Sequence, residues 1–258
     1  MKRTVAYLSE QFLNSPDARS LRLLSEYLHP LLHLRREKIR DTIVFFGSAR
    51  IAESGPLGRY YQEARALAGK LTQWSDGLEN SARRFVVCTG GGPGIMEAAN
   101  RGAYEAGGKS IGLNIGLPTE QLPNPYISPE LGFEFHYFFM RKFWFAYPGK
   151  AFVMFPGGFG TLDELMEILT LVQTKKLHKK IIIVLYGSEF WKEIVNFDAL
   201  VRLGTISAED LNLFQFADDV DTAFDLVRDG LTKHHLQEEG ETPAMAKAAD
   251  PAQRKDPL

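Results

Sequence analysis

The segment AFVMFPGGFGTLDELMEILT, residues 151–170, places two acids directly after a group of glycines. Glycines between a strand and a helix let a phosphate approach the backbone, and the helix N-terminus attracts it. Asp163 and Glu164 lie at the start of this predicted helix. A carboxylate beside a phosphate is electrostatically unfavourable unless it has a second role, such as contact with a positive centre. Glycosidic cleavage passes through an oxocarbenium-like state, and a carboxylate there can stabilise the positive charge or activate water.

The same residues also allow a structural interpretation. Thr161, with Glu164 three positions later, has the pattern of a capping box, and acids suit the first turn of a helix. However, Gly157, Gly158 and Gly160 are more glycine than a cap requires, and they follow the most apolar strand segment of the chain. Helix capping and ligand binding both stay open at this point.

Two further segments, FFGSAR (45–50) and CTGGGPGIMEAAN (88–100), join a strand to a loop or helix through small residues. In an open parallel sheet, ligands bind at the carboxyl ends of the strands, so both segments are candidate ligand contacts. The structural alternative is a tight turn with Pro93 in the first helical turn. The candidate contacts in these segments are Ser48, Gly91, Gly92, Gly94, Met96 and Asn100.

These junctions do not match the common nucleotide-binding motifs. Gly92 and Gly94 would need a third small residue at position 97 to form the dinucleotide fingerprint, and that residue is Glu97. The segment GAYEAGGKS (102–110) is one residue too long for a P-loop and leads into a strand instead of following one. A mononucleotide or a sugar phosphate therefore fits better than NAD or ATP.

Two cations and a further acid lie near these segments. Arg141 and Lys142 stand among aromatics in FFMRKFWF (138–145), either as contacts to a phosphate or leaving group or as the solvated edge of an amphipathic helix. Glu120 lies in a proline-rich loop, either as a ligand contact or as an exposed acid. The histidines have no partner acids at metal-ligand spacing, and we expect neither a metal nor a cofactor.

Composition points to an ordinary globular protein. The 258 residues are 45% hydrophobic with a formal net charge of −2, so neither nucleic acid nor a membrane surface is an expected partner. The N-terminus has no signal-peptide pattern and the chain has no long apolar span, which predicts a cytoplasmic protein. The single cysteine, Cys88, excludes an intramolecular disulfide.

Apolar segments alternate with helical segments from residue 42 onward, which predicts an α/β fold: a Rossmann-like, doubly wound parallel sheet with helices on both faces. Pro30 is expected to break or kink the leucine-rich helical segment 15–40. We expect an N-terminal helical extension over 1–40, a nucleotide-binding domain over 41–236 and a disordered tail over 237–258. The expected strands are 42–50, 84–94, 109–117, 133–139, 150–158, 179–187 and 214–219, and the expected helices include 57–75, 95–107, 161–176 and 188–204.

Together, GGGPGIMEAAN, MRK and PGGFGTLDE resemble the Lonely Guy (LOG) family, once widely misnamed lysine decarboxylases. The family pattern P-G-G-x-G-T-x-x-E is matched at every fixed position from Pro156 to Glu164. The resemblance implies a phosphoribohydrolase, which cleaves the N-glycosidic bond of AMP or an N6-modified, cytokinin-type AMP to free base and ribose 5-phosphate. Decarboxylation has no support, because no lysine lies inside the glycine junctions to form a pyridoxal phosphate Schiff base.

The resemblance also implies roles for single residues. Arg141 and Glu164 would be the catalytic pair. The implied phosphate contacts are Gly157, Gly158, Gly160 and Thr161, and the implied nucleotide contacts are Lys142, Asp163, Glu120 and Thr170. Members of the family are homodimers or larger homo-oligomers, with the active site near the subunit interface. Short members carry a histidine where this chain has Phe139 and lack the N-terminal helices, so the chain is similar to the longer subgroup.

Two other functions would keep the same glycine junctions. Molybdenum-cofactor carrier proteins share the expected fold and bind a phosphorylated pterin without catalysis, and a nucleotide sensor would bind its ligand and release no product. The pair of Arg141 and Glu164 favours the enzyme over both alternatives. The preferred base and the biological role stay open.

Overall fold

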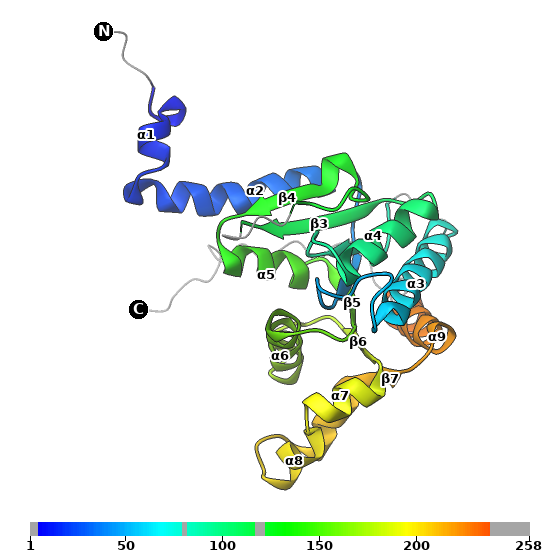
Figure 1. The fold of residues 1–258 in the computed structure, drawn as a ribbon. Coiled ribbons are helices and arrows are strands. Elements are labelled where there is room, and N and C mark those ends of the chain that lie inside the picture. Colours follow the sequence, from blue (N-terminus) through cyan, green and yellow to red (C-terminus); the bar gives the residue numbers. More distant parts are fainter. Residues whose placement is uncertain (1–4, 79–81, 117–121, 238–258) are drawn as a thin grey trace.

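Seven parallel strands form one sheet in the order β4-β3-β2-β1-β5-β6-β7 (Figure 1). The computed structural model describes residues 5–78, 82–116 and 122–237. The strands are β1 (Thr42–Phe46), β2 (Val86–Thr89), β3 (Ser110–Ile115), β4 (Gly132–Phe135), β5 (Gly149–Met154), β6 (Ile182–Tyr186) and β7 (Gln215–Ala217). The predicted Rossmann-like α/β fold is confirmed.

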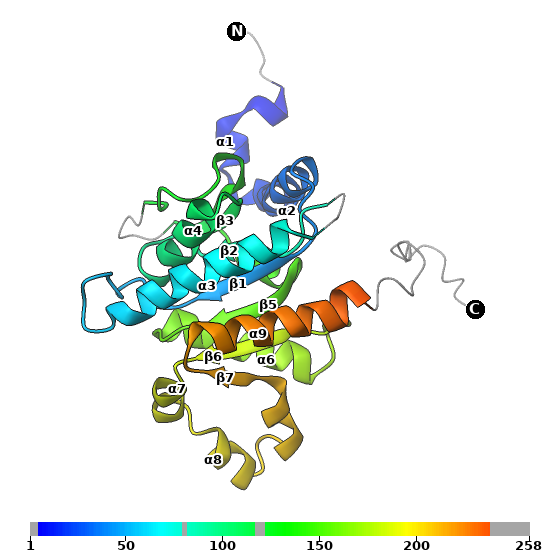
Figure 2. The ribbon, with the colours of Figure 1, turned by 90° about the vertical axis from the view of Figure 1, so that its right-hand side faces the viewer.

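Successive side chains of a strand point to opposite faces of the sheet, and in the central strands both sets are apolar. Both faces are therefore covered by helices. In β1, Ile43 and Phe45 belong to one hydrophobic cluster and Val44 and Phe46 to the other. Helices α3, α4 and α9 pack on the first face, and α2, α5 and α6 on the second (Figure 2). The helices are α1 (Glu10–Leu13), α2 (Arg19–Arg36), α3 (Gly58–Asp76), α4 (Ile95–Glu105), α5 (Phe138–Ala146), α6 (Phe159–Gln173), α7 (Ser188–Ile194), α8 (Phe197–Arg202) and α9 (Val220–Leu231).

Two predicted elements differ from the structure. The helix expected over 188–204 is interrupted after Ile194, where Val195 is extended and the Asn196 side chain accepts a hydrogen bond from the Ala199 N–H at 2.9 Å. Asparagine at this position starts a second helix as an N-cap, so the prediction of one helix is wrong. The strand expected over 133–139 ends at Phe135, because α5 begins three residues later.

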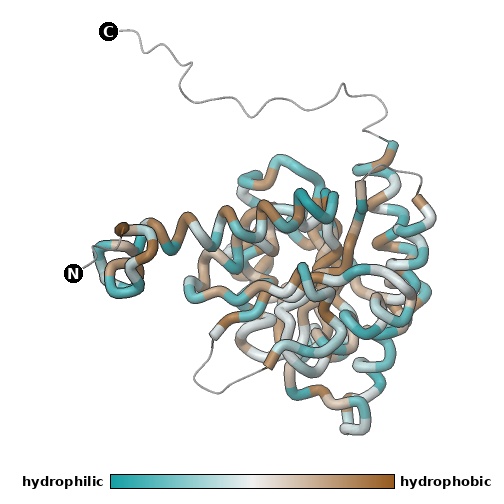
Figure 3. The backbone as a smooth tube through the Cα atoms, turned by 90° about the horizontal axis from the view of Figure 1, so that it is seen from above, coloured by the Kyte–Doolittle hydropathy of each residue, from teal (hydrophilic) through white to brown (hydrophobic). Residues whose placement is uncertain are grey.

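The N-terminal helix α2 continues through Pro30, so of the two expected outcomes the break is wrong and the kink stays a prediction. Proline has no N–H, and the carbonyl of Glu26, four residues earlier, therefore receives no hydrogen bond from it. The indole Nε1 of Trp144 in α5 donates to this carbonyl oxygen at 3.0 Å instead. Helices α1 and α2 form an N-terminal arm that extends from the body of the domain, and in Figure 3 hydrophobic residues recur along it.

The boundary expected at residue 40 lies in a connecting segment, whereas the one expected at residue 236 lies inside the helical turn Thr232–Gln237. Helix α2 ends at Arg36 and β1 begins at Thr42, on either side of the boundary expected at residue 40. The tail expected over 237–258 lies outside the described residues from 238 onward. Within the described ranges, no helix combines the length and the hydropathy needed to cross a membrane.

Candidate active site

The strand order reverses at the centre of the sheet, and a cavity lies at this position. From β1 the chain proceeds through β2 to β4 on one side, and then continues with β5 on the other side of β1. A crevice at such a switch point is the usual ligand site of an open parallel sheet. The cavity has a volume of about 780 Å³. Its lining comprises Phe46, Gly47, Ser48, Ala49, Arg50, Met96, Phe138, Arg141, Gly157, Gly158, Phe159, Gly160, Thr161, Leu162, Glu164, Phe190 and Ile194.

The start of α6 forms one wall of this cavity. Gly158 is the N-cap and Phe159 the first helical residue, so Thr161 and Glu164 lie inside the helix and do not form the capping box that their spacing allows. The structural interpretation of this motif is therefore wrong. The first N–H groups of a helix have no partner within it, and together with the helix dipole they suit an anion.

Glu164 is a buried acid with a shifted pKa. Only 4% of the surface of Glu164 is exposed. Burial raises the pKa of Glu164 to about 7, although Lys142 and Arg141 act to lower it. A carboxyl group with a pKa near neutrality exchanges protons readily at physiological pH, which is the property of a general acid or base.

Arg141 reaches the cavity from α5 and is held in place by the backbone. Its Nε donates a hydrogen bond to the Leu113 carbonyl at 2.7 Å, at the end region of β3. A Cβ on Gly90 would lie 2.5 Å from the Arg141 Nη2, so a larger residue there would displace the guanidinium from this position. Burial lowers the pKa of Arg141, and among the opposing influences the Glu164 carboxylate is the largest, which couples the two groups electrostatically.

Lys142 and Asp163 contact each other. The Lys142 Nζ lies 2.7 Å from a carboxylate oxygen of Asp163 and 2.7 Å from one of Glu167. Burial alone would lower the pKa of Lys142, but its hydrogen bonds to the two acids outweigh this and raise it. Neither Lys142 nor Asp163 lines the cavity, so their roles as nucleotide contacts stay predictions.

The glycine turn after β2 is tied to the protein itself. The Asn124 Nδ2 donates to the carbonyl oxygens of Gly91 and Gly92 at 3.2 and 3.0 Å. Asn100 is fully buried, and its amide oxygen accepts hydrogen bonds from the Thr89 hydroxyl and from Asn124. These groups have structural partners, and their predicted contact with a ligand stays a prediction.

The remaining predicted residues lie in different places. Ser48 and Met96 line the cavity, on the side of β1 and α4. The Thr170 hydroxyl donates to the Met166 carbonyl within α6 and is not part of the lining. Glu120 lies outside the described residues.

An apolar wall that the sequence did not indicate completes the cavity. Phe190 and Ile194 come from α7, and with Phe138 and Leu162 they face the glycine turn. The side chain of Phe159 is 93% exposed at the start of α6. Only the helical spacing of 190 and 194 in SEFWKEI could have placed them on one face, and it does not indicate what that face contacts.

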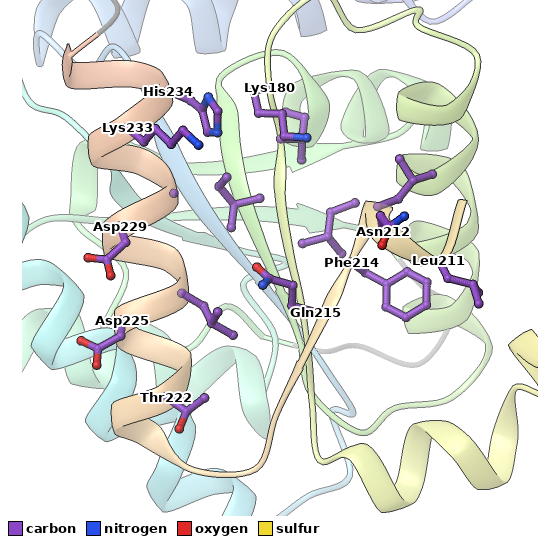
Figure 4. Close-up of a pocket in the computed structure, with 16 residues that line it drawn as sticks. Lys180, Leu211, Asn212, Phe214, Gln215, Thr222, Asp225, Asp229, Lys233 and His234 are labelled. Atoms are coloured by element: carbon purple, nitrogen blue, oxygen red, sulfur yellow. The ribbon is translucent and has the colours of Figure 1, made fainter. Parts of the chain in front are cut away.

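A second cavity of about 670 Å³ lies between α9 and β6 with β7 (Figure 4). Its lining includes Asp225, Asp229 and Lys233 of the C-terminal helical segment, and Lys180 and Gln215 on the side of the sheet. It shares none of its lining residues with the cavity at the switch point and includes none of the three glycine junctions. The switch-point cavity is therefore the candidate active site.

Comparison with known proteins identifies the family of the chain. A family model described as "possible lysine decarboxylase" matches residues 96–227, more than half of the sequence. The cytokinin riboside 5′-monophosphate phosphoribohydrolase LOG of Oryza sativa subsp. japonica is 31% identical over 180 residues, which cover 68% of this chain and 67% of the rice protein. This chain belongs to the LOG family.

Further comparisons agree on the family and the fold. The probable rice phosphoribohydrolase LOGL5 is 30% identical over 175 residues, and the match spans 66% of this chain and 64% of the relative. A structural-genomics crystal structure of the protein TM1055 superposes with a TM-score of 0.52 at 21% identity, covering 73% of this chain and 99% of that one. At this identity the crystal structure supports the shared fold alone. The activity printed for the rice relatives is theirs.

Proposed function

We propose that this LOG-family protein is a nucleoside 5′-monophosphate phosphoribohydrolase acting on AMP or an N6-modified, cytokinin-type AMP. One observation carries the proposal: a buried glutamate with a pKa near 7 shares a cavity with a backbone-anchored arginine and an open helix start. The rice phosphoribohydrolases, which are relatives of this chain, point to the same reaction class.

The cavity offers a place for each part of such a substrate. The start of α6, at Gly158, Gly160 and Thr161, would hold the 5′-phosphate through its free N–H groups. The apolar wall that includes Phe138 and Phe190 would take the base. The ribose would then lie between phosphate and base, beside Glu164.

Glu164 and Arg141 would divide the chemistry between them. As the bond between C1′ and the base breaks, its electron pair leaves with the base, and positive charge develops at C1′. The Glu164 carboxylate stabilises this charge or accepts a proton from the attacking water, which forms the new bond to C1′. The water supplies the hydroxyl on C1′ and, overall, the proton that the departing base takes up, so one water is consumed for each bond cleaved. Arg141, fixed through its Nε, donates hydrogen bonds from its Nη groups to the phosphate or the leaving base.

A panel of nucleotides tests the proposal. The purified protein is incubated with AMP, GMP, CMP, UMP and a prenylated AMP, and free base and ribose 5-phosphate are measured. We expect equal amounts of both products from AMP or the prenylated AMP. Binding of these nucleotides without product would contradict the proposal and favour a carrier or a sensor.

We further propose that the protein is a homodimer or a larger homo-oligomer. The face of α2 that points away from the domain carries Leu21, Leu24, Leu28 and Leu32, each between 44% and 50% exposed. An unpartnered stripe of leucines at helical spacing is typical of a helix that packs against another subunit. Light scattering after gel filtration should give a mass above 29.0 kDa, which Leu24→Glu should lower and Leu203→Glu, on another exposed leucine, should not.

A further inference from the structure

Helix α2 of the N-terminal arm contacts the helix that carries Arg141, and Glu26 provides three of the contacts. The two carboxylate oxygens of Glu26 accept hydrogen bonds from the backbone N–H groups of His136 at 2.8 Å and Tyr137 at 3.2 Å. These two residues directly precede the first residue of α5. The Glu26 carbonyl oxygen accepts the third hydrogen bond, from Trp144 Nε1 at 3.0 Å.

The third contact depends on Pro30. A helix carbonyl normally accepts a hydrogen bond from the N–H four residues later, and Pro30 has none. The Glu26 carbonyl is therefore free to accept the Trp144 indole, which lies in the last turn of α5. Pro30 thus leaves a backbone carbonyl of α2 available to accept a hydrogen bond from α5, while α2 itself continues.

Aromatic contacts extend the same junction. The ring of Tyr27 lies 5.7 Å from that of Phe143 and 5.9 Å from that of Trp144, between ring centroids. Arg22 Nε donates to the Tyr137 hydroxyl at 3.3 Å, so the entry to α5 is contacted from two turns of α2. At the other end of α5, Lys179 Nζ donates to the Ala146 and Tyr147 carbonyls at 2.7 and 2.6 Å.

We propose that Glu26 is a positioning residue: it fixes the start of α5 and thereby the direction in which Arg141 enters the cavity. The inference rests on the proposed function for its catalytic consequence. Arg141 lies one turn after Tyr137, and its own N–H donates to the Tyr137 carbonyl at 3.3 Å. A shift of Tyr137 therefore moves the Arg141 backbone, and a displacement of about 1 Å can cost roughly a hundredfold in rate. The acid also suits the positive end of the helix dipole of α5.

Two measurements on Glu26→Ala and Glu26→Gln test the inference, with Glu10→Ala in the same arm as the matched control. Hydrogen exchange should speed up at the His136 and Tyr137 amides, and the NMR signal of the Arg141 Nε–H should shift or broaden as its bond to Leu113 loosens. These readouts need no substrate. The Gln variant keeps one acceptor oxygen and should fall between wild type and Ala.

Kinetics then separates positioning from a loss of stability. With AMP or the prenylated AMP, we expect kcat to fall about ten- to a hundredfold in Glu26→Ala, and KM to change less than kcat. Trp144→Phe, which removes the indole donor together with part of the buried ring but keeps Glu26, should have a smaller effect in the same direction. An unchanged Arg141 signal, or an altered signal with wild-type kcat, would overturn the inference. If wild type itself releases no base, the proposed function fails, and the Arg141 signal still decides whether Glu26 positions it.

Discussion

The two glycine-rich turns of this protein differ in what their glycines do. In the turn from β2 to α4, a Cβ on Gly91 would lie 2.0 Å from the Asn114 amide oxygen, and one on Gly94 would lie 2.3 Å from the Ser48 carbonyl. In the turn from β5 to α6, a Cβ on Gly158 or Gly160 would meet no described atom within 4 Å. Gly91 and Gly94 of the first turn are needed for its packing. In the second turn Gly157 has the same role, because its Cβ would lie 2.1 Å from the Thr161 hydroxyl oxygen, whereas Gly158 and Gly160 leave space for something else.

The two helix starts differ in the same way. The Ile95 N–H at the start of α4 donates to the Ser48 carbonyl at 3.2 Å, so the chain itself occupies that position. The start of α6, at Phe159 and Gly160, lines the cavity. Two motifs that look equivalent in the sequence thus have different surroundings. The open space beside Gly158 and Gly160, together with the cavity that they line, makes the start of α6 the candidate ligand site.

The strongest test of this difference adds a methyl group to the turn from β2 to α4. Gly91→Ala should lower the free energy of unfolding by about 2–5 kcal/mol. Alanine is strained in the left-handed conformation that residue 91 adopts, and its Cβ would overlap Asn114. Denaturant unfolding measures the loss. Gly107→Ala is the matched control, because Gly107 also has positive φ but open space around it, and it should lose only the backbone part. Equal losses in the two variants would contradict the packing role.

In α6, which follows the turn from β5, we expect burial of Glu164 to lower the free energy of unfolding at neutral pH. Its pKa is raised to about 7, so the folded protein binds a proton more tightly than the unfolded chain, and stability falls as pH rises from about 4.5 to 7. Glu164→Gln should remove this slope and be more stable than wild type at pH 8 by up to about 3 kcal/mol. Unfolding at several pH values measures the difference, with the exposed Glu193→Gln as control. A wild-type curve as flat as that of Glu164→Gln would show that the acid is not destabilised by burial.

A methyl group in the open turn should have the smallest effect on stability. Gly160→Ala replaces glycine in the first turn of α6 where a Cβ meets no described atom, so it should stabilise the protein by about 0.5–1 kcal/mol. The same methyl group would intrude on the proposed phosphate position, and kcat/KM for AMP should fall about tenfold. A melting curve and a steady-state assay on one preparation measure both. Unchanged kcat/KM would argue against a phosphate at this helix start.

The sheet could be predicted from the sequence because its strands are apolar throughout and each is followed by a helical pattern. The switch point was not predicted, since strand order depends on which strand β5 pairs with, and no local pattern encodes that pairing. The division between α7 and α8 was missed because Asn196 as a helix cap competes with the continuous apolar spacing around it.

The candidate site was predictable only where its residues stand in a motif. Arg141 and Glu164 were found because MRK and PGGFGTLDE carry them, and the structure brings both to one cavity. Phe190 and Gly90 were missed, since one serves as a wall and the other as space for a guanidinium. Such roles depend on packing between segments far apart in the chain.

The most direct test compares AMP turnover by wild type and Glu164→Gln, with AMP affinity measured for both. We expect wild type to release adenine and ribose 5-phosphate at a rate that rises with pH around 7, as the carboxylate forms. Glu164→Gln should bind AMP as well as wild type and lose at least about a hundredfold in turnover. Equal turnover by the two proteins, or bound AMP that neither protein cleaves, would contradict a phosphoribohydrolase that works through Glu164.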